Sequence, residues 1–194
     1  MRIAFSGKIC SGKSTAANIV QDILGCEASV AKLSVASRVK ELAIDLFGME
    51  QKDRKLLQVL GQKMKEIDPN VWTRALIKQI NNCGDKHIVI DDLRFPNELS
   101  ALRENGFIII RLEIQPELQL ERIKKTYPDT WESHVSRLDN ISETALDRHE
   151  QTDTAEPYNY KFDHVIHINR ETDIETLRKH LIETLANITK AQLI

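Results

Sequence analysis

The first residues whose types and spacing could do chemistry lie near the start of the chain, in Gly7-Lys-Ile-Cys-Ser-Gly12-Lys13-Ser14. This segment fits the GxxxxGK[ST] pattern of a phosphate-binding loop, with an apolar run before it and a helical pattern after it. Glycine at the two fixed positions lets several backbone N–H groups approach phosphate oxygens, where a side chain would obstruct them. The segment therefore predicts a site for the phosphates of ATP.

Two side chains of this loop have separate predicted tasks. Lys13 is expected to place its ammonium group against the β- and γ-phosphates, and the Ser14 hydroxyl is expected to complete the shell of a Mg²⁺ ion. The positive N-terminal end of the following helix adds to the attraction for phosphate. The residues predicted to bind ATP are Gly7, Lys8, Ser11, Gly12, Lys13, Ser14 and Thr15.

Two carboxylates follow an apolar run in His87-Ile-Val-Ile-Asp91-Asp92-Leu-Arg94. At the carboxyl end of a parallel strand they would lie beside the phosphate loop, where an acidic residue binds magnesium directly or through water. Asp91 and Asp92 are both candidates, because strand alternation points them to opposite sides. Arg94 is a candidate for balancing charge on the transferred group. The alternative is that the acids only cap the helix that begins near Pro96.

The acceptor of the phosphoryl group needs cations and a binding surface of its own. We expect these in a segment of about residues 34–80, between the second and third predicted strands, which contains Arg38, Lys40, Arg54 and Lys65. Each of these charges is as often a solvated surface group. Trp72 is predicted either to stack on a nucleobase or to pack in the core. The predicted acceptor-binding residues are Arg38, Lys40, Arg54 and Trp72.

A charged segment of about residues 115–160 is the candidate lid. Its prolines at positions 128 and 157 interrupt helical patterns, as expected of a mobile cover or of a plain surface excursion. Arg122 is the best candidate in it for neutralising charge on the transferred group. After the last predicted strand, residues 169–172 are expected to contact adenine, by analogy of fold alone.

Short apolar runs alternate with helical patterns along the chain, which predicts an α/β fold with a five-stranded parallel sheet and flanking helices. The whole chain, 1–194, is predicted to be a single domain. The predicted strands are 2–5, 30–33, 87–90, 107–112 and 164–168, and the predicted helices are 14–24, 39–47, 53–66, 71–80, 97–105 and 173–185.

The composition excludes several classes of protein. The formal net charge is −2, so there is no broad basic field of the kind that binds polymeric nucleic acid. No segment approaches the roughly 18 uninterrupted apolar residues of a membrane span. Three widely spaced cysteines fit neither a disulfide framework nor a metal site, and they favour the reducing cytoplasm. The sequence leaves the oligomeric state open, with a homodimer among the options.

Several of these motifs together resemble the deoxynucleoside monophosphate kinases of phages and large DNA viruses. The resemblance rests on the phosphate loop, Lys40, Arg54 with Leu57 to Gly61, Trp72 and above all Asp92-Leu-Arg-Phe-Pro-Asn-Glu98, with a weaker echo in Ser142-Glu143. It implies a P-loop NTPase of the nucleoside monophosphate kinase type with a lid. It also implies transfer of the γ-phosphate of ATP to a deoxynucleoside monophosphate, giving the diphosphate and ADP, and it makes Asp92 the matching acid. Ser37-Arg38 departs from the family pattern, where a proline is usual.

Two alternatives stay open. The chain is also similar to animal-type phosphomevalonate kinases, which share the phosphate loop, a lysine like Lys40, the Asp-x-Arg of Asp92 to Arg94 and a stretch like residues 142–147. The acceptor would then be phosphomevalonate or another small phosphorylated metabolite. A nucleotide-binding switch without catalysis would use the same loop to order a segment of chain.

Overall fold

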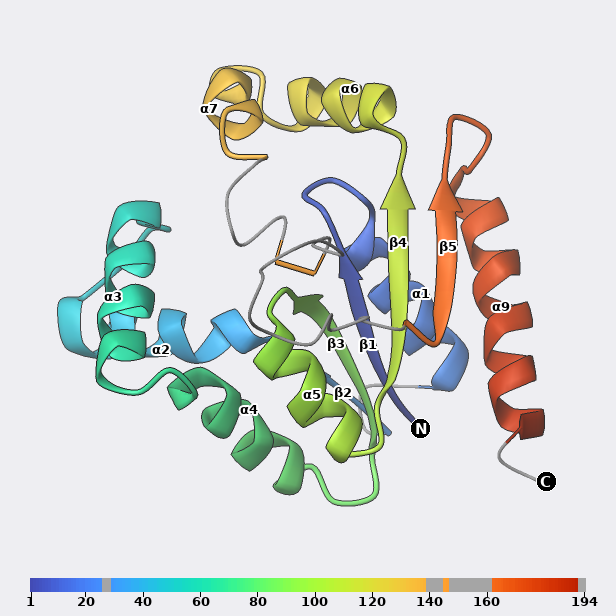
Figure 1. Cartoon of the computed structure of the whole chain (residues 1–194), viewed down its shortest axis with the longest axis horizontal. Helices are drawn as coiled ribbons and strands as arrows, with labels where there is room; N and C mark the ends of the chain where they lie inside the picture. Colours follow the sequence, from blue (N-terminus) through green and yellow to red (C-terminus); the bar gives the residue numbers. More distant parts are fainter. Residues whose placement is uncertain (26–28, 139–144, 147–161, 192–194) are drawn as a thin grey trace, which may run out of the picture.

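The fold is built on a parallel sheet of five strands, in the order β2-β3-β1-β4-β5 (Figure 1). The computed structural model describes residues 1–25, 29–138, 145–146 and 162–191. All four strand pairings within the sheet are parallel, as the sequence predicts. The strands are β1 (Arg2–Gly7), β2 (Val30–Leu33), β3 (His87–Leu93), β4 (Ile108–Ile114) and β5 (His164–Ile168).

Helices cover both faces of the sheet, and each face has its own apolar core. On one face α1 (Lys13–Leu24) and α9 (Ile174–Ala191) pack together, and on the other α4 (Val71–Asn81) and α5 (Pro96–Glu104) do so (Figure 1). Strand alternation divides β1 between them, because Ile3 and Phe5 belong to the first core and Ala4 to the second. The central strand is thereby held from both sides.

Two pairs of helices lie away from this sandwich. In Figure 1, α2 (Val35–Phe47) and α3 (Arg54–Ile67) extend to the left of the sheet, and α6 (Pro116–Thr126) and α7 (Trp131–Val135) lie above the carboxyl ends of the strands. The helix α6 ends just before Tyr127-Pro128, as expected for a proline that interrupts helical hydrogen bonding. Residues 116–138 of the predicted lid are thus mainly helical, and its positions 139–144 and 147–160 lie outside the described residues.

Two of the elements that extend beyond their predicted bounds, β3 and α2, bear on the site. The strand β3 continues through Leu93, so that Asp91 and Asp92 belong to the strand and do not follow it. The helix α2 begins at Val35, four residues before the predicted start at Val39. Its first backbone N–H groups donate hydrogen bonds to Asp92, which is far away in the sequence. The helical pattern of the segment itself does not indicate this partner, so the early start of α2 was not predicted.

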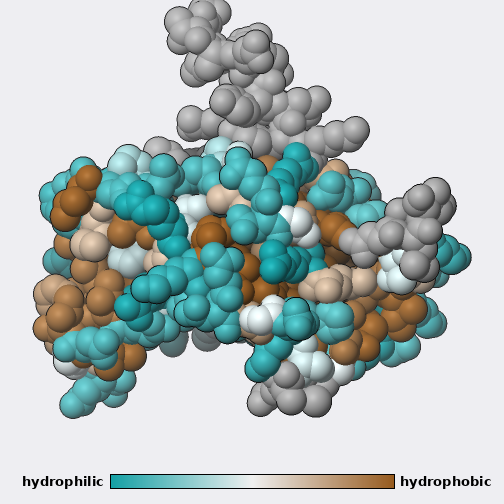
Figure 2. Space-filling model, turned by 90° about the horizontal axis from the view of Figure 1, so that it is seen from below, coloured by the Kyte–Doolittle hydropathy of each residue, from teal (hydrophilic) through white to brown (hydrophobic). Residues whose placement is uncertain are grey.

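Exposed apolar side chains gather on α2 and α3. Figure 2 shows apolar surface at its left edge, which is the side of α2 and α3 in Figure 1. The large apolar residues exposed there are Ile44, Leu46, Phe47, Val59 and Ile67. These helices therefore bury less of their apolar surface than the helices that cover the sheet. Within the part of the chain that the structure describes, no helix has the length and apolar character needed to span a membrane.

Candidate active site

The phosphate loop joins the carboxyl end of β1 to the start of α1, as the sequence predicts. Gly7 has a φ of +150°, and a Cβ atom there would lie 2.7 Å from the carbonyl oxygen of Leu112 and 2.6 Å from Oγ of Ser11. Gly12, at the N-cap of α1, has a φ of +98°. Both glycines are therefore required by the backbone, one for space and both for conformation.

Lys13 is the first residue of α1, and its side chain folds back over the loop. The Nζ atom donates hydrogen bonds to the carbonyl oxygens of Gly7, at 2.7 Å, and Lys8, at 2.6 Å. The side chain is only 8% exposed. The loop thus holds a buried ammonium group at the position where the motif predicts contact with phosphate.

A cavity of about 460 Å³ lies beside this loop. Residues 10–15 form one wall, and Arg122 with its neighbours on α6 forms another. Arg122 donates from Nη1 to the carbonyl oxygen of Cys10 at 3.3 Å. The structure therefore brings Arg122 to the phosphate loop. We call this space the donor cavity, and its lining residues are Cys10, Ser11, Gly12, Lys13, Ser14, Thr15, Arg122, Lys125, Thr126, Tyr127, Ile168, Thr172, Asp173, Ile174 and Leu177.

Sequence reasoning missed a second tether between α6 and the loop. Gln119 is 4% exposed, and its Nε2 atom donates to the carbonyl oxygen of Ile9 at 3.0 Å. Gln119 and Arg122 are three residues apart on one helix, so they share a face. The three-residue spacing from Arg122 could have indicated that Gln119 faces the loop. In a charged segment, however, a glutamine is as readily interpreted as a surface residue.

The far end of the donor cavity is formed by the turn after β5. Thr172 lines it, within the segment 169–172 that the sequence predicts to contact adenine. Thr172 donates from Oγ1 to Oδ1 of Asn169 at 2.8 Å and accepts from the N–H of Asn169 at 3.1 Å. These bonds fix the turn and leave apolar side chains of α9, Ile174 and Leu177, in the lining.

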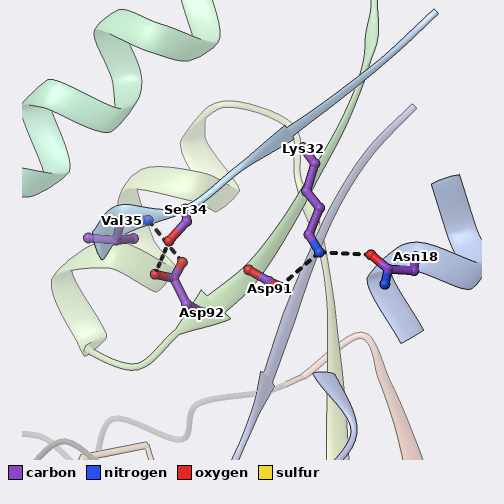
Figure 3. Close-up of polar contacts among 6 residues, drawn as sticks. All are labelled: Asn18, Lys32, Ser34, Val35, Asp91 and Asp92. Atoms are coloured by element: carbon purple, nitrogen blue, oxygen red, sulfur yellow. Dashed lines mark hydrogen bonds and ion pairs between the residues drawn. The ribbon is translucent and has the colours of Figure 1, made fainter. Parts of the chain in front are cut away.

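The two acids of β3 point in different directions, as strand alternation predicts (Figure 3). Asp92 accepts hydrogen bonds from Oγ of Ser34 at 2.6 Å and from the N–H groups of Val35 and Ala36, both at 2.9 Å. Asp91 lies 3.3 Å from Nζ of Lys32. Because β3 pairs with β1, both acids belong to the strand next to the phosphate loop.

A second cavity, of about 420 Å³, lies beside Asp92, and we call it the acceptor cavity. Trp72 lines it, although the residue is 4% exposed and its Nε1 atom donates to the carbonyl oxygen of Gly61 at 3.0 Å. Lys65 places its ammonium 3.8 Å from the centre of the Phe95 ring. The lining residues are Val35, Ala36, Val39, Leu57, Gln58, Gly61, Gln62, Lys65, Trp72, Asp92, Arg94, Phe95 and Glu98.

Glu98 is the buried acid of the acceptor cavity, and from the sequence it was predicted only to belong to a motif. Its Oε2 atom accepts from the N–H groups of Arg94 at 3.0 Å and Phe95 at 3.1 Å. The residue is 3% exposed. Burial is the largest influence and raises its pKa from 4.5 to about 7, against the opposing effect of the two backbone hydrogen bonds. Glu98 thus holds the turn that presents Arg94 and Phe95 to the cavity.

Some predicted acceptor residues lie elsewhere. Arg38 is exposed on α2 and pairs with Glu41 at 2.6 Å, and Lys40 is exposed on the same helix. The structure places both outside the lining of the acceptor cavity. Arg54 is the first residue of α3, three positions before Leu57, which lines the acceptor cavity. Roles for Arg38, Lys40 and Arg54 in binding remain predictions.

Comparison with known proteins supports the fold. No protein-family profile matches the sequence, and no curated protein matches it. Among solved structures, shikimate kinase from Acinetobacter baumannii is similar, with a TM-score of 0.56, 15% identity and coverage of 100% of this chain and 95% of that one. APS kinase from Mycobacterium tuberculosis has a TM-score of 0.55, 14% identity and coverage of 95% and 96%. The chain therefore shares its fold with these two kinases.

Proposed function

We propose that this protein transfers the γ-phosphoryl group of ATP to a deoxynucleoside monophosphate. The observation that carries the proposal is the pair of cavities beside adjacent strands of one sheet. The donor cavity contains the phosphate loop at the end of β1, and the acceptor cavity contains aromatic and cationic side chains at the end of β3. Ligands of α/β sheets bind at the carboxyl ends of strands, where both cavities lie.

In the donor cavity, Lys13 and Arg122 are the proposed catalytic cations. Both side chains donate hydrogen bonds to carbonyl oxygens of the loop. When ATP binds, Lys13 and Arg122 would replace these bonds with stronger, charge-assisted bonds to its phosphates. Phosphoryl transfer needs positioning and neutralisation of charge on the moving group more than covalent help from the protein. Arg94, which lines the acceptor cavity, is proposed to balance charge from the other side.

The donor set also fits Mg²⁺, which prefers oxygen ligands and keeps several of its waters. Ser14 lines the donor cavity with an exposed side chain at the start of α1, and Asp91 and Asp92 lie on the adjacent strand. Ser14 and one of these acids would hold the ion together with ATP. When bound, the ion would neutralise charge on the β- and γ-phosphates.

In the acceptor cavity, the rings of Trp72 and Phe95 fit a planar base, and Lys65 and Arg94 fit a phosphate. An oxygen of that phosphate forms a bond to the γ-phosphorus as the bond to the β–γ bridging oxygen breaks. ADP leaves, and a deoxynucleoside diphosphate is formed. The acceptor oxygen is already anionic, so no catalytic base is required.

The nucleotide acceptor is favoured over phosphomevalonate by the two aromatic rings and by the sequence Arg94-Phe-Pro-Asn-Glu98. Phosphomevalonate has a phosphate for the cations but no ring to stack. A switch without catalysis would not need a second cavity with this lining.

The test is coupled release of ADP from ATP and Mg²⁺ with each of the four common deoxynucleoside monophosphates, with phosphomevalonate and with no acceptor. We expect acceleration by orders of magnitude with at least one deoxynucleotide. Activity with phosphomevalonate alone would transfer the assignment to that acceptor. No acceleration by any acceptor would favour the switch.

A further inference from the structure

Both carboxylate oxygens of Asp92 accept hydrogen bonds from the start of one helix. Oδ2 accepts from Oγ of Ser34 and the N–H of Ala36, and Oδ1 accepts from the N–H of Val35 (Figure 3). The partners are 56 to 58 residues away in the sequence. Unpaired N–H groups in the first turn of a helix attract a carboxylate, and here the carboxylate comes from a different element.

These bonds join two walls of the acceptor cavity. Val35 and Ala36 line it from α2, and Asp92 lines it from β3. The helix α2 has few other anchors, because Ala43 is its one fully buried residue and Ile44, Leu46 and Phe47 are more than half exposed. Because little apolar packing holds α2, its position depends more strongly on the hydrogen bonds to Asp92.

Asp91 differs from Asp92 in this respect. Its contact is with the Lys32 ammonium at 3.3 Å, and that ammonium also donates to Asn18 of α1 at 2.9 Å. Asp91 thus contacts the end of a long side chain, whereas two of the three hydrogen bonds to Asp92 come from backbone N–H groups. Moving Asp92 toward a metal ion would strain three hydrogen bonds, and moving Asp91 would weaken one ion pair.

We propose that Asp92 is a positioning residue, which fixes the width of the acceptor cavity by clamping the N-terminus of α2 to β3, and that Asp91 is the acid left for Mg²⁺. The proposal rests on the proposed function for the identity of the acceptor. The family resemblance makes Asp92 the acid that matches a metal ligand, and the proposal gives that role to Asp91. It predicts that loss of Asp92 weakens binding of the acceptor even when no Mg²⁺ is present.

The test measures acceptor binding without Mg²⁺ or ATP, by tryptophan fluorescence. The chain has two tryptophans. Trp131→Phe therefore leaves Trp72, in the lining of the acceptor cavity, as the sole reporter. In this background Ser34→Ala and Asp92→Asn should each raise the acceptor Kd about ten-fold, as expected for a lost hydrogen bond to a charged group. The double variant should lose less than the product of the two effects, because both changes break the same clamp.

Two controls separate the clamp from general damage. Ser37→Ala removes a serine of the same turn whose Oγ bonds to the carbonyl oxygen of Ser34 and not to Asp92, and it should leave the Kd within about two-fold. Asp91→Asn should raise the Mg²⁺ concentration needed for half-maximal turnover and leave Mg²⁺-free binding of the acceptor unchanged. Asp92→Asn should do the reverse.

An unchanged acceptor Kd in Asp92→Asn, with a raised Mg²⁺ requirement, would overturn the proposal and return Asp92 to the metal. If the unaltered protein binds no deoxynucleotide, the proposed function fails. Hydrogen exchange then still tests whether Asp92 holds the N-terminus of α2. The amides of Val35 and Ala36 should then exchange faster in Ser34→Ala and Asp92→Asn than in Ser37→Ala. Equal exchange in all three variants would reject the clamp.

Discussion

The donor and acceptor cavities are built in different ways. The phosphate loop is one run of residues between β1 and α1, and its form depends on glycines and backbone groups. The acceptor cavity is lined by residues of α2, α3, α4, β3, the turn before α5 and α5 itself, which are spread over more than sixty positions. A contiguous backbone site can be recognised from a short motif, whereas a site assembled from several elements depends on how those elements pack.

The two cavities also differ in charge. The donor cavity is lined by three cations, Lys13, Arg122 and Lys125, and one acid, Asp173. Lys13 and Arg122 donate to carbonyl oxygens of the loop. The acceptor cavity mixes the acids Asp92 and Glu98 with Lys65 and Arg94. We therefore expect changes on the donor side to affect the rate of transfer, and changes on the acceptor side to affect affinity and pH dependence.

The largest effect is expected on the donor side. Lys13→Ala removes the buried ammonium and should lower kcat/KM for ATP by about a thousand-fold or more, because charge on the transferred group loses its closest neutralising partner. Steady-state kinetics measure this loss. Lys86→Ala, which removes an exposed lysine before β3, is the control and should keep full activity. Retention of a tenth of the activity in Lys13→Ala would refute the assigned role.

The second effect belongs to the acceptor side and concerns stability. Glu98 has a pKa of about 7 in the folded protein, compared with 4.5 ordinarily, so the folded state holds its proton more tightly than the unfolded state. This tighter binding of the proton adds to the free energy of unfolding, and the addition is complete below pH 4.5. It amounts to about 3 kcal/mol and is lost as the pH rises through 7. Glu98→Gln keeps an oxygen acceptor and cannot titrate.

Urea unfolding at a series of pH values measures this contribution. The free energy of unfolding of Glu98→Gln should increase relative to that of the unaltered protein between pH 4.5 and 8. A difference that does not depend on pH would show that Glu98 does not titrate in this range.

A third effect should be confined to acceptor affinity. Lys65→Ala removes the ammonium beside Phe95 and should raise the KM for the acceptor about ten-fold, with the KM for ATP unchanged. Lys63→Ala is a matched control, because Lys63 lies on the same helix, is exposed and pairs with Glu66. Equal effects of the two variants would mean that Lys65 acts only as surface charge.

The smallest effect concerns the tether between α6 and the phosphate loop. Gln119→Ala breaks the bond to Ile9 and should raise the KM for ATP several-fold, in line with about 1 kcal/mol for a hydrogen bond. Gln115→Ala is the control, since Gln115 is exposed at the N-cap of the same helix and its side chain makes no capping bond. If Gln119→Ala instead changed only the KM for the acceptor, α6 would not belong to the donor side.

Sequence reasoning predicted the sheet and the loop because their signals are local. Apolar runs of four to six residues marked all five strands, and Gly7, Gly12 and Lys13 are fixed by the motif itself. The early start of α2 could not be predicted, because its cap comes from Asp92 on another element. Gln119 and Glu98 were missed as site residues for a similar reason, since burial gives them their partners.

The acceptor side shows the limit most clearly. Arg38 and Lys40 were chosen by charge and position in the sequence, and each is exposed on α2 and lies outside the cavity lining. Lys65, with the same charge, faces the acceptor cavity because of its position on α3. The helical pattern of a segment indicates which face is apolar, but it does not indicate which charged residue meets a cavity formed by other helices.

The measurement that tests the central claim most directly is the fate of the terminal phosphate of γ-labelled ATP in the presence of the best deoxynucleoside monophosphate. If the two cavities serve one transfer, the label appears in the β-phosphate of the deoxynucleoside diphosphate, and Lys13→Ala abolishes its appearance. Label released only as inorganic phosphate, at a rate that does not depend on the acceptor, would contradict the account.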